Sequence, residues 1–337
     1  MADMIIANPG LAQSDTGKDR LGMFLKVFTG EVLTAFSQAT ITGGRFTERT
    51  IKHGKSAVFP IVGRAKAKYL KAGKSLDDLR TPIEHNERTI VLDGLLTADT
   101  MIFDLDDAMN HYEVRSIYSK ELGEALAVAQ DGAVLAEVAK MVVKQEENIK
   151  DNAETGVKGT GKGLIVTEAV AEADYGETEA LGMAIFKELL TIKTHMSENN
   201  VPRTQRNCYI RPMALNALIA HKDIINKLYG ATMTIEEDKP AKLLGFDLIE
   251  APMLTQGGTD NENVIQGDGH EFPSTYKDTC QFLVAHPYSA GILTLKGLGT
   301  EHARRPEYQA DQFIFKYAKG FGGLRPEAAY MGVITKA

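Results

Sequence analysis

The sequence has few cysteines, no long apolar run and no excess of positive charge, and each of these absences excludes a class of protein. Cys208 and Cys280 are the two cysteines among 337 residues, too few for a disulfide framework, so a reducing compartment is favoured. No stretch approaches the roughly 18 consecutive apolar residues that a membrane-spanning helix needs. The net charge of −7 argues against a dedicated nucleic-acid-binding protein, whose domains are usually basic.

The remaining composition is that of an ordinary globular protein, with 43% hydrophobic and 25% charged residues. The first 20 residues are polar, contain Pro9 and Gly10, and do not show the charged-then-apolar layout of a secretory signal. We therefore expect a soluble, cytoplasmic protein with one large domain or a few smaller ones.

Positive charge is concentrated between Arg45 and Arg88. This segment has eleven Lys and Arg against five Asp and Glu, a net charge of +6, so the rest of the chain carries −13. Ser56–Val62 is β-branched and aromatic, with a proline that suits an edge strand. A turn at Lys71–Lys74 and a returning strand at Thr89–Leu92 complete a long basic hairpin. The hairpin has too few apolar residues for its own core, so it must lie on another surface.

A long acidic helix is expected from Asp104 to about Glu147. Apolar residues recur there at spacings of three and four, and acidic residues open the segment, where they favour the positive end of a helix. Ten acidic and four basic residues give it a charge of −6. At about 1.5 Å per residue it would be roughly 60 Å long. Gly123 and Gly132 each cost about 1 kcal/mol within a helix, which indicates close packing or a bend.

The basic hairpin and the acidic helix have complementary charges, so they could be partners within one chain or between neighbouring chains. Two separately solvated faces would explain the same charges.

Beyond a Gly- and Thr-bearing boundary at 151–163, helices and strands are mixed without a regular βαβ alternation. The expected elements are a strand at 164–166, a helix at 181–196, a strand at 207–210, a helix from Pro212 to about His221, strands at 243–250 and 281–285, and a final strand at 312–317. This order favours an α+β fold over a doubly wound sheet.

The segment Gly156–Gly163 resembles a nucleotide-binding phosphate loop at every fixed position except the last. That position must be Ser or Thr, because the hydroxyl holds the magnesium ion, and here it is Gly163. The context is also inverted, because the loop follows a charged stretch and precedes a strand. A nucleotide-using enzyme built on Lys162 therefore remains a minor alternative.

The sequence offers no other pattern typical of catalysis or metal binding. The eight histidines show no zinc-site spacing. Asp104, Asp106 and Asp107 lack the glycine and the later glutamate of a calcium loop, and a helix-opening cluster explains them better. Both cysteines lie in apolar, strand-like settings that favour burial. We expect no catalytic residue, no metal and no cofactor.

Five segments of the chain resemble the major capsid protein of T-seven-like short-tailed bacteriophages. They are Met23–Ser37, Gly54–Leu79, Asp93–Ile117, Leu122–Lys140 and Arg304–Tyr330. The resemblance covers most of the first 140 residues and the last 35, and is weak between Lys144 and Lys296.

The resemblance implies a Hong-Kong-97-type capsid fold. An N-terminal arm would occupy residues 1–50 and an extended β-hairpin loop residues 51–96. A peripheral domain with a long spine helix would occupy residues 97–164, and an axial domain residues 165–285. Residues 286–337 would return to the peripheral domain.

The resemblance also implies function and partners. Many copies would assemble into pentamers and hexamers that close an icosahedral shell around double-stranded DNA. The protein would assemble in the host bacterial cytoplasm with a scaffolding protein and a portal protein, would contact DNA weakly, and would belong to the virion. A cellular nanocompartment shell of the same fold is the alternative within this architecture.

We expect the +6 hairpin to dock on acidic surface of a neighbouring subunit. The candidates for contacts between subunits are Lys55, Arg64, Lys66, Lys68, Tyr69, Lys71, Lys74, Asp104, Asp106, Asp107, Glu113, Glu121, Glu124, Arg304, Arg305 and Arg325. Some relatives lock their shells with a lysine–asparagine bond, but plain solvated lysines are the expectation here.

Overall fold

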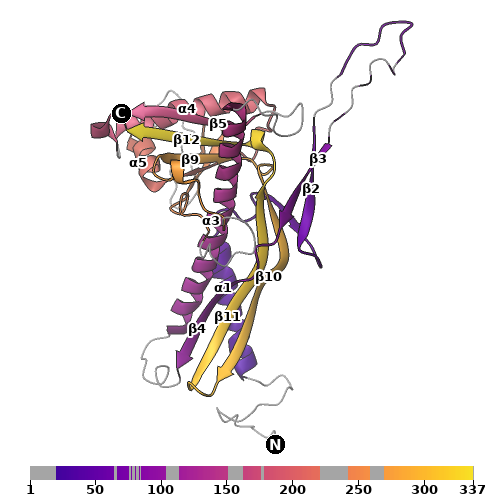
Figure 1. Ribbon diagram of the computed structural model, residues 1–337. Coiled ribbons are helices and arrows are strands. Elements are labelled where there is room, and N and C mark those ends of the chain that lie inside the picture. The colour runs from indigo at the N-terminus through magenta and orange to yellow at the C-terminus, as the bar shows by residue number, and fades with distance from the viewer. Residues whose placement is uncertain are drawn as a thin grey trace, which may run out of the picture.

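The computed structural model describes residues 20–63, 67–75, 77, 80, 83, 85–103, 114–150, 162–175, 178–220, 242–258 and 269–336. They form an elongated molecule in which one long helix, α3 (Val114–Lys150), runs along two unequal sheets (Figure 1). A separate two-stranded ribbon projects to one side. Helices and strands are mixed, so the expected α+β class is confirmed.

The wider end of the molecule contains a six-stranded sheet in the order β5-β12-β9-β6-β8-β7. Its strands are β5 (Leu164–Val170), β6 (Asn207–Ile210), β7 (Lys242–Leu243), β8 (Phe246–Glu250), β9 (Cys280–Ala285) and β12 (Ala329–Lys336). Helices α4 (Glu179–Glu198) and α5 (Pro212–Ala220) cover one face, and α3 packs on the other. Successive side chains of β9 point to opposite faces of the sheet and so contribute to both hydrophobic cores. Phe282 lies in the core with α4, and Leu283 lies in the core with α3.

The narrower end contains a four-stranded sheet in the order β1-β10-β11-β4. Its strands are β1 (Thr47–Thr50), β4 (Leu96–Phe103), β10 (Ala290–Arg305) and β11 (Ala310–Gly323). Helix α1 (Arg20–Ala39) and the first half of α3 pack on one face of this sheet. Their shared core contains Val32, Leu126, Phe313, Phe315 and Tyr317.

Two glycines allow close packing along α3, as one of the two sequence interpretations required. A Cβ at Gly123 would lie 2.8 Å from the Cβ of Ala35 on α1. A Cβ at Gly132 would lie 2.0 Å from the carbonyl oxygen of Gly257. Both distances are too short for any side chain, so each glycine fixes how closely a neighbouring segment approaches the helix.

The projecting ribbon pairs β2 (Ser56–Val62) with β3 (His85–Val91) in antiparallel register. Its root packs against β10 and the segment before β12, through Ala57, Phe59 and Ile90 against Leu293 and Leu324. The opposite face of β2 is exposed, which gives the strand its strict alternation. The expected two-stranded hairpin is confirmed, but its returning strand, expected at Thr89–Leu92, begins four residues earlier at His85.

The structure differs from the sequence expectations in several elements. The described helix begins at Val114, and the expected start at Asp104 lies outside the described residues. The expected strand 243–250 is two strands joined by a turn at Leu244 and Gly245, whose φ angles are 54° and 89°. Strand 312–317 extends over Ala310–Gly323 and is not the last, because β12 follows it.

Other elements were not expected at all. Helix α1 lies within the range expected to be an arm, and β4, β10 and β12 were not predicted. Three short 3-10 turns lie at Glu172–Asp174, Ser274–Tyr276 and Pro326–Ala328.

Candidate intersubunit interface

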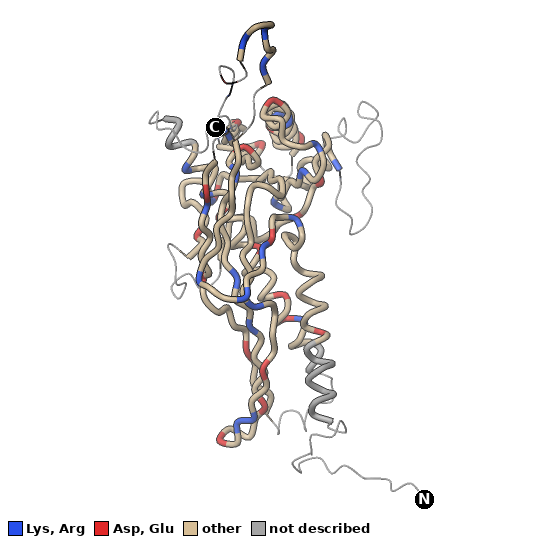
Figure 2. The backbone as a smooth tube through the Cα atoms, turned by 90° about the vertical axis from the view of Figure 1, so that its right-hand side faces the viewer, with Lys and Arg blue, Asp and Glu red and all other residues tan. Residues whose placement is uncertain are grey.

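The far end of the hairpin is exposed and cationic. Every described residue from 67 to 75 is exposed, and Tyr69 has a fully solvent-accessible side chain. Lys68, Lys71 and Lys74 lie in this segment, which has no acidic residue (Figure 2). The expected turn is present, because the amide of Lys74 donates to the carbonyl of Lys71 at 3.1 Å. This segment lies away from the body of its own chain (Figure 1).

Two arginines hold the ribbon to the body along β2. Nη1 of Arg49 on β1 donates to the carbonyl of Val58 at 2.5 Å, and its guanidinium lies 6.0 Å from the centre of the Phe59 ring. Nη2 of Arg325 donates to the carbonyl of Val62 at 3.1 Å. Arg325 was expected to contact another subunit, but within one chain it already holds the ribbon.

A buried ionic cluster lies at the root of the hairpin. Asp93 follows β3, Glu137 lies on α3, and His270 lies in the loop before β9. His270 Nδ1 is 2.8 Å from Glu137 Oε1, and His270 Nε2 is 2.9 Å from Asp93 Oδ2. Lys140 Nζ lies 3.2 Å from the same oxygen of Glu137. The cluster therefore joins three segments that are distant in sequence.

The protonation of this cluster follows from its pairing. Burial alone would lower the pKa of His270, but hydrogen bonds to Asp93 and Glu137 outweigh burial and raise it to about 9. Burial raises the pKa of Asp93. Burial acts in the same direction on Glu137, but its bonds to His270 and Lys140 prevail and lower the pKa. At neutral pH His270 is a cation between two acids.

Asp131 fixes the chain as it leaves α1. The carboxylate accepts hydrogen bonds from Thr40 Oγ1 at 2.8 Å, from the amide of Ile41 at 2.8 Å, and from the amide and hydroxyl of Thr42. The side chain is fully buried on α3. It therefore anchors the end of α1 to the long helix.

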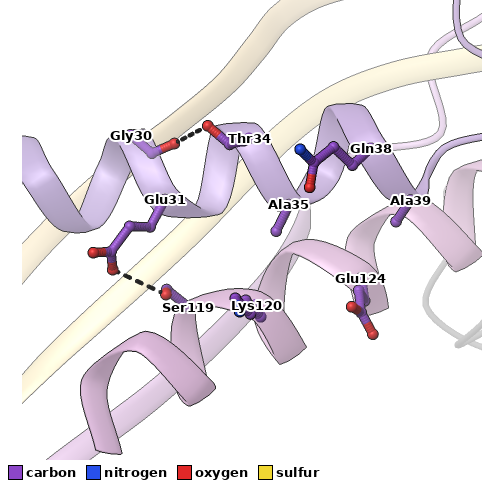
Figure 3. Close-up of a pocket in the computed structure, with 9 residues that line it drawn as sticks. All are labelled: Gly30, Glu31, Thr34, Ala35, Gln38, Ala39, Ser119, Lys120 and Glu124. Atoms are coloured by element: carbon purple, nitrogen blue, oxygen red, sulfur yellow. Dashed lines mark hydrogen bonds between the residues drawn. The ribbon is translucent and has the colours of Figure 1, made fainter. Parts of the chain in front are cut away.

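An open groove of about 790 Å³ lies between α1 and α3 (Figure 3). Glu31 points from α1 towards α3, where its carboxylate accepts a hydrogen bond from Ser119 Oγ at 3.1 Å. Glu124 lines the groove, and Glu121 is exposed one turn earlier on the same helix. Two of the expected acidic contact residues thus lie on an accessible face of α3.

The expected contacts Arg304 and Arg305 lie near the tip of the β10–β11 ribbon, at the end farthest from the six-stranded sheet (Figure 1). Arg304 Nη1 lies 3.3 Å from Asp311 Oδ1. Arg305 Nε donates to Gln312 Oε1 at 3.0 Å. Tyr308 at the tip is 60% exposed. Both arginines have partners across the ribbon and remain accessible.

The candidate contacts thus lie in separate places, at the hairpin end, the hairpin root, the α1–α3 face and the ribbon tip. Lys55 is exposed beside the start of β2. Arg64, Lys66, Asp104, Asp106, Asp107 and Glu113 lie outside the described residues. The roles of Arg49 and of the Asp93–Glu137–His270 cluster could not be predicted from the sequence, because no local spacing links residues so far apart.

Gly163, the last residue of the segment that resembles a phosphate loop, has a structural role. Residues 156–161 lie outside the described part of the chain. The amide of Gly163 donates to Gln145 Oε1 at 2.9 Å, and a Cβ there would lie 2.4 Å from the carbonyl oxygen of Pro326. The glycine therefore allows close packing of the start of β5.

Cys208 and Cys280 are free thiols, both buried in the six-stranded sheet, as expected. Burial raises the pKa of both, to about 12 for Cys280. Within the described residues, no group of His, Cys, Asp and Glu is placed to hold a metal ion. No helix in the described ranges is both long and apolar enough to cross a membrane.

Comparison with solved structures defines the class of protein. The capsid protein of cyanophage P-SCSP1u aligns with a TM-score of 0.71 and 27% identity, over 89% of each chain. The architecture is the Hong-Kong-97-type capsid fold, the fold of proteins that build phage shells.

Sequence comparison then gives the family. The family described as Gp10A-like major capsid protein matches residues 58–333, and the chain belongs to this family. The major capsid protein of Enterobacteria phage T3 is 42% identical, over 98% of this chain and 96% of the relative. That of Escherichia phage T7 is 41% identical, over 92% of this chain and 91% of the relative. The chain is a structural subunit of a phage capsid and a component of the virion shell.

Proposed function

We propose that copies of this chain form pentamers and hexamers that close an icosahedral shell around packaged double-stranded DNA. The observation that carries the proposal is the exposed, cationic end of the hairpin, which stands apart from its own body. A surface of this kind needs a partner, and in a shell the nearest partner is the next copy. Contacts that close by rotation make rings, and rings in slightly different settings tile a shell.

Each part of the chain would have the role expected from the domain division. Residues 1–50 would form the arm, 51–96 the extended loop, 97–164 with 286–337 the peripheral domain, and 165–285 the axial domain. Two features support this division. Most strands of the six-stranded sheet fall within 165–285, and the four-stranded sheet combines β4 with β10 and β11. The axial domain would meet its copies at the centre of each ring.

The hairpin would dock on acidic surface of the neighbouring peripheral domain. Lys68, Lys71 and Lys74 supply exposed positive charge, and Glu121 and Glu124 supply exposed negative charge on α3. Individual exposed ion pairs contribute about 1 kcal/mol or less, so the docking would depend on several pairs together.

We further propose that the protein is non-catalytic, needs no cofactor, and works with a scaffolding protein and a portal protein. Its net charge of −7 would keep contacts with DNA weak, which favours packaging and ejection. Labelled ATP should not bind the protein. Specific binding that Lys162→Ala abolishes would contradict this part of the proposal.

Sedimentation and negative-stain microscopy of the expressed protein, alone and with its scaffolding protein, test the main proposal. We expect uniform shells that depend on the scaffold. A stable small oligomer under every condition would contradict the proposal. Shells that form without a scaffold and enclose a cargo enzyme would indicate a cellular compartment instead.

A further inference from the structure

The two edges of the β2–β3 ribbon differ in how their backbone groups are satisfied. The amide of Leu92 donates to the carbonyl of Lys55 at 2.9 Å, and the register continues with Ala57 opposite Ile90 and Phe59 opposite Arg88. In an antiparallel ladder, hydrogen-bonded pairs alternate with non-hydrogen-bonded pairs. Since Lys55 and Leu92 form a hydrogen-bonded pair, the pairs Ala57–Ile90 and Phe59–Arg88 are hydrogen-bonded as well. The residues between them direct their N–H and C=O groups away from the partner strand.

The outer edge of β2 is closed by residues of the same chain. The outward carbonyls of Val58 and Val62 accept hydrogen bonds from Arg49 and Arg325. Pro60 lies between them and has no N–H to offer. A further strand therefore cannot add along this edge without displacing both arginines.

The outer edge of β3 is different. Its outward residues are His85, Glu87 and Thr89, and every residue from 85 to 89 is exposed. Within the part of the chain that the structure describes, the edge is closed only at its root, where the amide of Asp93 donates to the carbonyl of Lys319 at 3.1 Å. The outward amide of Glu87 donates to the exposed side chain of Asn86 at 2.8 Å, a local contact that can exchange. Among the described residues, no strand other than β2 pairs with β3.

We propose that the outer edge of β3 accepts a strand from a second copy of this chain, so that the ribbon becomes part of a sheet between subunits. The proposal deepens the proposed function and rests on it. An unpaired edge is a template for pairing with another chain, and proteins that avoid such pairing block the edge with proline or charge. Here Pro60 and the two arginines close the edge of β2. Strand β3 carries the charged residues Glu87 and Arg88 but no proline, and among the described residues no other segment donates to or accepts from its outward backbone groups between His85 and Thr89.

The occupant is a copy of this chain because a capsid shell places identical subunits beside one another. The ribbon also projects from its own body, so its edge is within reach of a neighbour (Figure 1). Main-chain hydrogen bonds would then supply the contact, as in other cases of strand addition. Asn86 would release the amide of Glu87 when the strand arrives.

Residue-resolved amide hydrogen exchange tests the proposal on the unassembled chain and on assembled shells. In the unassembled chain we expect slow exchange at Asn86 and Arg88, which pair with β2, and fast exchange at His85, Glu87 and Thr89. In shells, the last three amides should also exchange slowly. Shells in which they still exchange fast would overturn the inference and leave the proposed function intact.

A proline variant provides the second test. Glu87→Pro removes an outward N–H directly opposite Pro60 and leaves the β2 ladder unchanged, so the chain should fold normally. Because each lost hydrogen bond weakens a contact by up to about tenfold, many such contacts together should strongly reduce shell yield. The matched control Glu87→Gln keeps the N–H and should assemble normally.

Normal shells from the Glu87→Pro chain would overturn the inference. Loss of slow amide exchange at Asn86 and Arg88 in this variant would show that the substitution has damaged the β2–β3 ribbon. In that case the inference is decided by amide exchange at His85, Glu87 and Thr89 in wild-type shells. Failure of the wild-type chain to form shells under any condition would contradict the proposed function, and the inference would fail with it.

Discussion

Glu188 shows how a single buried group can make the stability of the fold depend on pH. Its side chain on α4 is fully buried beneath the six-stranded sheet. Burial first, and repulsion from Glu168 second, raise the pKa of Glu188 to about 9, and a backbone hydrogen bond from Glu168 offsets only part of this. The folded protein therefore holds this acid in its neutral form at neutral pH.

The sign of the pH dependence follows from linkage. The unfolded chain ionises Glu188 at its ordinary pKa, so the contribution of this group to stability is complete below that value and is lost as pH rises towards about 9. Glu188→Gln should remove this slope. Urea unfolding at pH 5 and pH 8 should show that the variant gains stability relative to wild type between the two pH values. Parallel curves for the two proteins would contradict the argument.

The cation at His270 gives a second prediction at the scale of residues. Replacing one partner of a buried ion pair costs about 3–5 kcal/mol, because the remaining charges are left unpaired. His270→Gln should therefore strongly destabilise the protein near pH 6. The pKa of His270 is raised to about 9, so the wild-type advantage should shrink as pH rises from the ordinary histidine value through about 9.

His195 provides the matched control for His270. It lies on α4 with 42% of its side chain exposed, 3.7 Å from Glu198. His195→Gln should change the free energy of unfolding by about 1 kcal/mol or less at every pH. Equal effects of the two substitutions would show that the cluster at the hairpin root does not stabilise the fold.

Among the helices, two glycines allow the cost of close packing to be measured separately from the intrinsic preference of a helix for alanine over glycine. Gly132→Ala should be destabilising, because its Cβ would overlap the backbone of Gly257 and push α3 from the neighbouring loop. Such overpacking typically costs about 1–3 kcal/mol. Gly30→Ala on α1 is the control, since no atom of the described residues lies within 4 Å of its added Cβ.

Urea unfolding of both glycine variants distinguishes the two effects. Gly30→Ala should stabilise the chain by up to about 1 kcal/mol, from helix preference alone. Stabilisation at Gly132 as well would contradict the close packing described for α3.

Local patterns explain which elements could be predicted. Strand β2, helices α4 and α5, and most of α3 follow from apolar periodicity within each segment. Of β3, only the part from Thr89 onwards could be predicted, because His85–Arg88 are polar and exposed. Strand β10 was missed because it contains Gly297, Gly299 and many polar residues, and it is fixed by pairing with distant strands. One of these is β1, whose Thr47 pairs with Gly291. The turn within 243–250 needed a residue with positive φ, Leu244, that no local signal marks.

The candidate interface could also be predicted only in part, because its charge is a local feature of the sequence and its contacts join distant residues. The charge of the hairpin is visible in composition, and the structure leaves its described end exposed. The role of Arg325 at the ribbon was not visible, because its partner Val62 lies 263 residues away. The ionic cluster was hidden for the same reason, since Glu137 and His270 are separated by 133 residues.

At the scale of the whole molecule, the hairpin charge leads to a prediction on assembly. Reversing Arg64, Lys66 and Lys68 to Glu changes the charge of the hairpin without altering any described packing contact. The variant should fold but fail to form shells, as measured by sedimentation. The matched variant Arg64→Lys, Lys66→Arg and Lys68→Arg keeps the charge and should assemble. Normal shells from the charge-reversed chain would refute electrostatic docking.

The hairpin is anchored along its paired strands, and this has a mechanical consequence. Phe59 and Ile90 fix the strands in an apolar contact, and Arg325 holds Val62 at the far end of β2. Residues 67–75 lie beyond this last anchor. Turning that segment towards a neighbouring copy therefore leaves every described contact of the paired strands in place. One sequence can thereby reach neighbours that stand at different angles, with its anchor unchanged.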